Sequence, residues 1–434
     1  MSRADEEALH AALDAYDSGN LAQAEPVLRT LAARHPGSYE ANEALGSLYA
    51  ESGDEAHALV YLRRACLIAP RAALAHANLG AAYLKLSNTA GAIRELQTAA
   101  SLDPSSLPTQ SDLGQALLLA AHFDGAAQAF AAAAKLAPQD NALKYNLALA
   151  LYQAGKEDRA SDVLATIPAE AMTDQYHSLA GDADEKSGRF QQALLHFQAA
   201  ARLNPSDPNL YALTTELLRH WTWPEAIEIA NYGDRLYPGS SHFKMAAGFA
   251  YYAKGDYKPA VQVFSGLLQS DPENAQLADL LGRSCSLLAD DERAACGGIY
   301  EYAERHPGNP ILTTYAAVAI LHEPQDKQDL EKAATMLRSA IAADPTYPEA
   351  YFQLGVLEQA RLHWIESTAY LQKSIALRPK WAEAHYRLSR AYAHLGRREE
   401  AQAEIALQQT YSQESKQALN TKLQEVMKFV LKPS

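Results

Sequence analysis

Apolar and small residues recur at helical spacing along almost the whole chain, in short segments separated by polar turns. Within residues 39–72 these positions are Leu45, Gly46 and Tyr49 in a first segment and Ala58, Leu62 and Ala65 in a second. Gly53 and Asp54 lie between the two segments and supply a helix-ending glycine followed by an N-cap. Helices of about 12–14 residues are marginal in isolation, so the pattern predicts helix pairs that are stabilised by stacking on their neighbours.

The same pattern returns with a period of 34 residues. The prolines that close successive second segments mark this period: Pro36, Pro70, Pro104 and Pro138. The next two repeats place Leu79, Gly80, Tyr83, Ala92 and Leu96, and then Leu113, Gly114, Leu117, Ala126 and Phe130, at equivalent positions. Small residues let the two helices of a pair approach each other, while Leu, Tyr and Phe fill the space between them. The period therefore indicates a repeat solenoid rather than two or three globular domains.

These positions resemble the tetratricopeptide repeat family, and the resemblance covers nearly the whole chain. It implies an all-α fold, a right-handed superhelical solenoid of antiparallel helix pairs, with about twelve repeats in residues 5–411. Residues 5–140 are regular, 141–347 mostly irregular and 348–411 regular again. In the irregular section Pro168 arrives early and predicts a short second helix, and Trp221 replaces a turn glycine. An extra residue near Asp290 and a four-residue insertion within 321–330 lengthen two later turns.

Residues 412–430 follow the last repeat and carry an apolar stripe at helical spacing. The stripe consists of Leu419, Leu423, Val426, Met427 and Val430. We interpret this segment as a C-terminal capping helix, since a terminal repeat otherwise exposes its core face. An independent coiled coil is the alternative, but the stripe spans barely two heptads.

Composition and charge limit the kinds of partner and the location that we expect for the chain. The chain has a net charge of −14 and no large cluster of Lys and Arg, which argues against nucleic acid as a partner. No run of residues approaches the about 18 apolar positions of a membrane span, so membrane insertion is not expected. The polar N-terminus has no signal-peptide pattern, which favours the cytoplasm; a periplasmic or secreted location would apply if a signal peptide had been removed.

Sequence motifs for catalysis or cofactor binding are not found in the chain. It has no Walker A, GxSxG, HExxH or strand-linked GxGxxG motif, and the repeats leave no room for a catalytic domain. We therefore expect no enzyme activity, cofactor or metal. Cys285 and Cys296 fall on the two helices of one repeat and are either two small buried thiols or a disulfide.

The family resemblance also suggests where a partner binds. In this family the first helices of the repeats line a concave groove, chiefly through their second, fifth, ninth and twelfth positions. Transferred to this sequence, those positions give Tyr145, Tyr152, Tyr211, Met245, Phe249, Tyr252, Phe352, Tyr386 and Arg390. Aromatic side chains offer large contact areas at low entropic cost, although some of them could simply pack between first helices.

Two binding modes known in the family can be compared with the sequence. The carboxylate clamp for chaperone C-terminal tails needs Lys, Arg and Asn at set positions in three consecutive repeats, and no such set is found, so a chaperone tail is disfavoured. The asparagine ladder that holds a peptide backbone would use Asn78 and Asn146, with Asp112 between them. The ladder stops after these three rungs.

The sequence thus favours a non-catalytic interaction scaffold that binds a peptide or partner protein in the groove. Two alternatives remain: a structural or oligomerising protein that uses the array ends, the convex face or the C-terminal helix, and an accessory subunit of an enzyme complex. The sequence names no partner, and a homo-oligomer through the C-terminal helix would belong to the first alternative.

Overall fold

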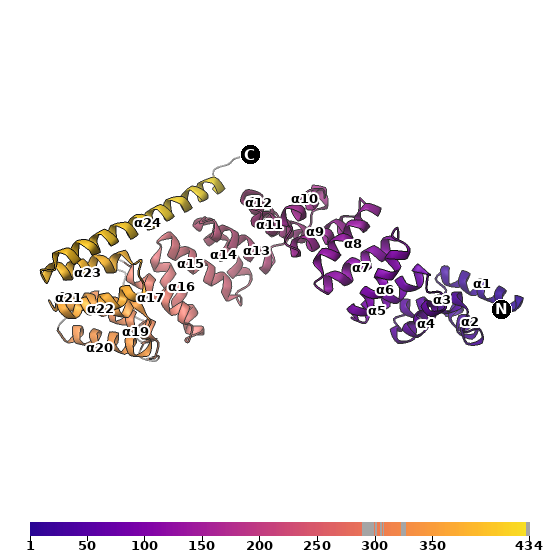
Figure 1. Ribbon diagram of the computed structural model, residues 1–434, viewed down its shortest axis with the longest axis horizontal. Coiled ribbons are helices and arrows are strands. Elements are labelled where there is room, and N and C mark those ends of the chain that lie inside the picture. Colours follow the sequence, from indigo (N-terminus) through magenta and orange to yellow (C-terminus); the bar gives the residue numbers. More distant parts are fainter. Residues whose placement is uncertain (289–298, 300–301, 304–305, 307, 323–326, 431–434) are drawn as a thin grey trace. The chain divides into compact units, whose positions relative to one another are not determined.

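The computed structural model describes the chain except for residues 289–298, 300–301, 304–305, 307, 323–326 and 431–434 (Figure 1). At 275, 286, 322, 327, 419–420 and 422–430 it describes the backbone alone. The chain divides into two compact units, Met1–Ala200 and Ala201–Ser434. Every regular element in the described residues is helical, which confirms the predicted all-α repeat array.

The first unit holds six helix pairs. Their helices are α1 (Arg3–Asp17), α2 (Leu21–Arg34), α3 (Tyr39–Glu51), α4 (Glu55–Ile68), α5 (Ala73–Lys85), α6 (Thr89–Leu102), α7 (Leu107–Leu119), α8 (Phe123–Leu136), α9 (Asn141–Gln153), α10 (Glu157–Leu164), α11 (Asp174–Lys186) and α12 (Phe190–Leu203), whose last three residues belong to the second unit. The second helix α10 has only 8 residues and is followed by the short 3-10 helix η1 (Ala169–Ala171), as the early Pro168 predicted.

The second unit continues the same alternation. Its helices are α13 (Asp207–Arg219), α14 (Trp223–Leu236), α15 (Ser241–Lys254), α16 (Tyr257–Ser270), α17 (Ala275–Ser286), α19 (Pro310–His322), α20 (Lys327–Ala343), α21 (Pro348–Ala360), α22 (Trp364–Leu377), α23 (Ala382–His394) and α24 (Arg398–Val430). The extra residue near Asp290, most of the insertion within 321–330 and Cys296 lie outside the described residues. The buried Cys285 is disulfide-bonded, and Cys296 as its partner stays a prediction.

Local sequence explains where many helices begin and turn. The side chains of Ser38 and Asp54 accept hydrogen bonds from the amides of Ala41 and His57, which caps α3 and α4. Between the helices of a pair the chain needs a residue with positive φ, which glycine supplies in Gly53 (φ 80°) and Gly396 (φ 74°). At the equivalent turns Ser87, Ala121, Trp221 and Leu362 adopt φ between 57° and 64° without that freedom.

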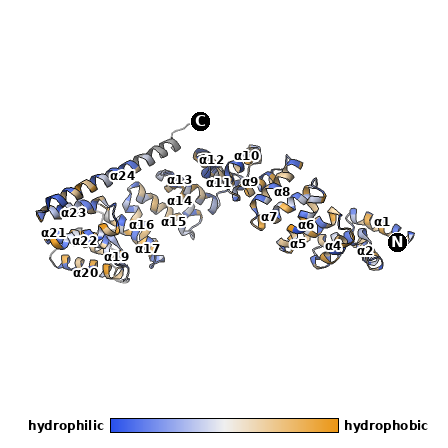
Figure 2. Ribbon diagram, in the orientation of Figure 1, coloured by the Kyte–Doolittle hydropathy of each residue, from blue (hydrophilic) through white to orange (hydrophobic). Residues whose placement is uncertain are grey.

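Within a pair, a glycine of the first helix faces a large residue of the second. A Cβ on Gly80 would lie 2.5 Å from Leu96 Cγ, and one on Gly114 would lie 2.8 Å from the Phe130 ring. The close approach lets Leu96 and Phe130 be fully buried at the centre of their pairs. Most helices carry both hydrophobic and hydrophilic residues (Figure 2). First helices are nevertheless buried on several faces, since residues 44–48 of α3 and 312–318 of α19 are buried without a break.

The C-terminal segment differs from the expected separate capping helix. Helix α24 runs without a break from Arg398 to Val430, through the boundary expected between 411 and 412. The capping segment is therefore the continuation of the last repeat's second helix. Residues 413–418 are exposed, and the side chains of Leu419, Leu423, Val426, Met427 and Val430 lie outside the described ones. Among the described residues, no helix combines the length and the apolarity that a membrane crossing requires.

Candidate functional site

Helix α15 presents four of the groove positions on one face. His242, Met245, Phe249 and Tyr252 follow one another at intervals of three or four residues and therefore line up along the helix. We call this stripe the α15 face. Phe249 is 41% exposed, whereas Met245 and Tyr252 are half-buried against the core of the second unit. Burial raises the pKa of the Tyr252 hydroxyl above its usual range.

Aromatic side chains from neighbouring elements border the α15 face. The ring of Tyr211 on α13 meets His242 edge-on at 4.4 Å, and Trp223 at the start of α14 meets Phe249 edge-on at 6.2 Å. Tyr211 keeps 42% of its surface exposed. Edge-to-face contacts hold these rings in fixed orientations, so the exposed areas of Tyr211 and Phe249 belong to a preorganised surface.

In the first unit the predicted aromatic residues are engaged with the next first helix. Tyr145 on α9 stacks on Tyr176 of α11 with ring centroids 4.7 Å apart, and the Lys186 ammonium lies 4.1 Å from the centre of the Tyr152 ring. The contact with Tyr152 raises the pKa of Lys186. Much of the surface of Tyr145 and Tyr152 thus serves to join successive repeats, and Asn146 is half-buried on the same helix.

Asn78 lines a hollow of about 430 Å³ between the first helices α1, α3 and α5. Its amide group donates hydrogen bonds to Glu43 Oε1 at 2.7 Å and Ser47 Oγ at 2.9 Å. Burial raises the pKa of Glu43, and the hydrogen bonds that Ser47 Oγ and Asn78 donate to its carboxylate partly counteract this rise. Because both amide hydrogens are engaged within the protein, Asn78 can offer a peptide backbone only its carbonyl oxygen. The neighbouring rung Asp112 is half-buried, and burial raises its pKa.

In the last two repeats the predicted groove residues differ in how far they are buried. Phe352 on α21 is only 7% exposed because Trp381 packs on it, with ring centroids 4.4 Å apart. It belongs to the core and has little surface to offer a partner. Tyr386 and Arg390 on α23 are exposed, Tyr386 to 40%.

The structure thus brings together some predicted residues and adds others. It joins Tyr211 and Phe249 to aromatic neighbours that sequence reasoning missed, namely His242 and Trp223. Trp223 lies at the start of a second helix and His242 at the second position of a first helix. The second-position rule could have found His242, whereas no rule of the repeat pointed to Trp223.

A polar contact also recurs between repeats, at the fourth position of the first helices. Here Asn42, His76, Gln110 and His385 each contact the carbonyl oxygen of the proline six residues earlier, Pro36, Pro70, Pro104 and Pro379. We call this contact the proline clip. It ties the first helix of one repeat to the end of the preceding repeat, and it satisfies a carbonyl that has no helical partner.

Three tetratricopeptide repeat models match the sequence, over residues 9–69, 117–183 and 382–417. A search of curated proteins found no match. Among solved structures, the chain is similar to the one described as Naa15/Naa10 bound to HypK-THB, with 15% identity and a TM-score of 0.45 over 98% of this chain. The chain spans 66% of that relative's length.

Two further solved structures are similar over different lengths. The APC/C hetero-tetramer Cut9–Hcn1 is 16% identical, with a TM-score of 0.37 and coverage of 100% of this chain and 95% of that one. The Pseudomonas aeruginosa protein pilF is 19% identical, with a TM-score of 0.38 and coverage of 48% of this chain and 94% of that one. At these levels of identity the similarities concern the fold alone.

Proposed function

The chain is a tetratricopeptide repeat protein, and we propose that it is a non-catalytic interaction scaffold that binds an extended peptide or partner helix along its first helices. One observation carries the proposal. Tyr211, Phe249 and Tyr386 lie at groove positions and keep 42%, 41% and 40% of their surface exposed. Large aromatic residues that remain this accessible on a tightly packed array are typical of recognition surfaces.

The α15 face is the strongest part of this surface. Phe249 projects from the middle of the helix, with Trp223 beside it and half-buried Met245 and Tyr252 on either side along the stripe. A partner side chain that packs on Phe249 would complete an apolar contact that the chain itself leaves open. Central aromatic residues of this kind carry a large share of the binding energy in protein interfaces.

Peptide selection on the immobilised full chain tests the proposal. Peptides enriched from a random display library would be synthesised, and their affinities measured by fluorescence anisotropy. We expect Phe249→Ala to weaken binding by about 2 kcal/mol, which is about thirty-fold in Kd. Ile365→Ala is the matched control, because Ile365 is 71% exposed but lies on the second helix α22. Equal affinity for the wild type, Phe249→Ala, Tyr211→Ala and Tyr386→Ala would contradict the proposal.

A second candidate function is self-association through the end of α24. The helix extends 19 residues beyond Tyr411, which is about 28 Å at 1.5 Å per residue, and residues 413–418 are exposed. The sequence places an apolar stripe on this extension, which a second copy could cover. Light scattering on the full chain and on a chain truncated after Tyr411 tests this. A dimer that becomes a monomer on truncation would support it, whereas a monomeric full chain removes its basis.

A further inference from the structure

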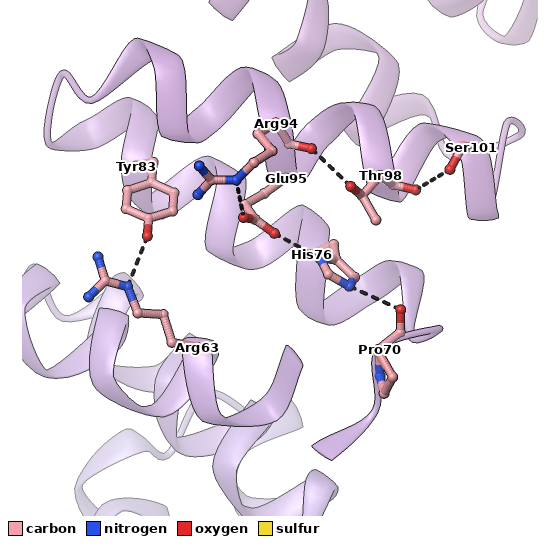
Figure 3. A network of polar contacts seen from close by, with 8 residues as sticks. All are labelled: Arg63, Pro70, His76, Tyr83, Arg94, Glu95, Thr98 and Ser101. Carbon is pink, nitrogen blue, oxygen red and sulfur yellow. Dashed lines mark hydrogen bonds and ion pairs between the residues drawn. The ribbon is translucent and has the colours of Figure 1, made fainter. Parts of the chain in front are cut away.

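Three side chains with metal-binding atoms converge between the second and third repeats. They are Cys66 at the end of α4, His76 on α5 and Glu95 on α6, and one ligand atom of each lies within 4.8 Å of the others. All three are largely enclosed: Cys66 is 9% exposed, and the side chains of His76 and Glu95 are 12% and 13% exposed. Figure 3 shows His76 and Glu95 pointing toward each other from neighbouring helices.

The hydrogen bonds of His76 fix which ring nitrogen faces the cluster. Nε2 lies 3.3 Å from the Pro70 carbonyl oxygen, which can only accept, so Nε2 carries the hydrogen of this proline clip. The other nitrogen, Nδ1, lies 2.9 Å from Glu95 Oε2. A histidine whose second nitrogen donates to a backbone carbonyl is oriented as metal-ligating histidines are. Two electron-pair donors this close need a proton or a metal ion between them.

The second carboxylate oxygen of Glu95 also accepts a hydrogen bond. Arg94 Nε donates to Oε1 at 3.0 Å, which leaves Oε2 directed at His76. The arginine therefore orients the carboxylate without occupying the oxygen that faces the cluster. In the absence of metal the thiol of Cys66 stays protonated, because burial raises its pKa to about 12. A metal ion would displace that proton.

An equivalent arrangement in the last repeat lacks the thiol. His385 lies between Glu404 Oε2 at 2.5 Å and the Pro379 carbonyl oxygen at 2.8 Å, with the same sequence intervals as His76, Glu95 and Pro70. The position equivalent to Cys66 is Ile375. Even the adjacent bond to a tyrosine is kept, from Arg63 to Tyr83 in one place and from Gln372 to Tyr392 in the other. The histidine and the carboxylate thus occur in both repeats, and Cys66 distinguishes the cluster around His76 from the one around His385.

We propose that Cys66, His76 and Glu95 form a binding site for one zinc-type divalent cation, with sulfur, nitrogen and oxygen ligands and a fourth place for water. This ligand set suits Zn²⁺, which accepts thiolate, imidazole and carboxylate in a tetrahedral shell. The ion would link α4 of one repeat to α5 and α6 of the next. It would therefore fasten two repeats to each other, independently of any partner on the first helices.

Titration of the reduced full chain with Co²⁺ tests the site, because cobalt bound to a thiolate shows a charge-transfer absorption. We expect one equivalent of Co²⁺ to produce this band and Zn²⁺ to remove it. Cys66→Ala, which keeps a small apolar group in the core, should abolish the band. His76→Gln should weaken Co²⁺ binding at least about tenfold and should fold, since Gln110 makes the same proline clip in the next repeat.

Two control variants separate this site from other ligands. Cys285→Ala removes a different cysteine, and His385→Gln alters the equivalent histidine without a thiol nearby; both should keep the band and the affinity. Zn²⁺ should raise the melting temperature of the wild type but not of Cys66→Ala. The proposal fails if the wild type gives no thiolate band, if Cys66→Ala keeps it, or if Cys285→Ala abolishes it.

Discussion

A single histidine position shows how one repeat site acquires different chemistry. The fourth position of the first helix holds His76 in one repeat and His177 in another, and the residue 19 positions later is Glu95 in the first and His196 in the second. His177 Nδ1 and His196 Nδ1 lie 2.8 Å apart. A carboxylate facing a histidine stabilises the protonated imidazole. Two histidines that face each other repel when both are protonated.

This difference predicts how stability of the first unit depends on pH. Burial lowers the pKa of both His177 and His196 below their ordinary value of 6.5. The nearby His196 lowers the pKa of His177 further. Asp184, which lies 3.7 Å from His196 Nε2, opposes the shift of His196. As the pH falls below about 6.5 the unfolded chain takes up protons before the folded one, so stability present above that pH is lost on acidification.

The measurement is the melting temperature between pH 7.5 and 5.5. We expect the wild type to lose more stability over this range than the variant His177→Gln/His196→Gln. His10→Gln changes an exposed histidine on α1 and should behave as the wild type does. An equal pH dependence of the double variant and the wild type would show that the pair does not govern acid stability.

At the scale of the element, the turn within each helix pair is the most constrained part of the repeat. It requires a residue with positive φ, which costs a non-glycine residue about 1–2 kcal/mol. Gly396 occupies this position after α23, and Leu362 occupies it after α21 with φ 64°. Leu362 is 69% exposed, so its side chain contributes little packing in return.

Leu362→Gly should therefore stabilise the chain. The relief of backbone strain exceeds the added entropy of the unfolded chain, and we expect a net gain of about 0.5–1 kcal/mol, measured as a higher urea midpoint. Gly396→Ala makes the reverse change at the equivalent position and should lower the midpoint by a similar amount. A midpoint of Leu362→Gly at or below that of the wild type would contradict the strain argument.

At the scale of the whole molecule, stability is built from contacts between neighbours. Helices pack chiefly against those next to them in the chain, so each repeat is supported by its two flanking repeats. The sequence of residues 141–347 departs from the regular 34-residue pattern. The exposed aromatic residues Tyr211 and Phe249 lie in that irregular section.

Repeat period and residue size were sufficient to predict the helix pairs. Gly80 and Leu96 are 16 residues apart, and only a small residue at the first position lets the second be buried. The pattern of small and large residues therefore predicts how the two helices pack. The early position of Pro168 likewise predicted the short helix α10. The extent of α24 was not predictable in this manner, because nothing in residues 398–430 stops a helix at Tyr411.

The sequence by itself determined the fold class, the family and the register of the first helices, since these follow from local periodicity. Only the tertiary structure decided which groove residues meet solvent. Tyr211 and Phe352 share one repeat position, yet Phe352 is buried because Trp381 covers it, while the residue equivalent to Trp381 beside Tyr211 is the small Ser240. Burial depends on side chains from the next repeat, and the convergence of Cys66, His76 and Glu95 from three helices depends on the same packing.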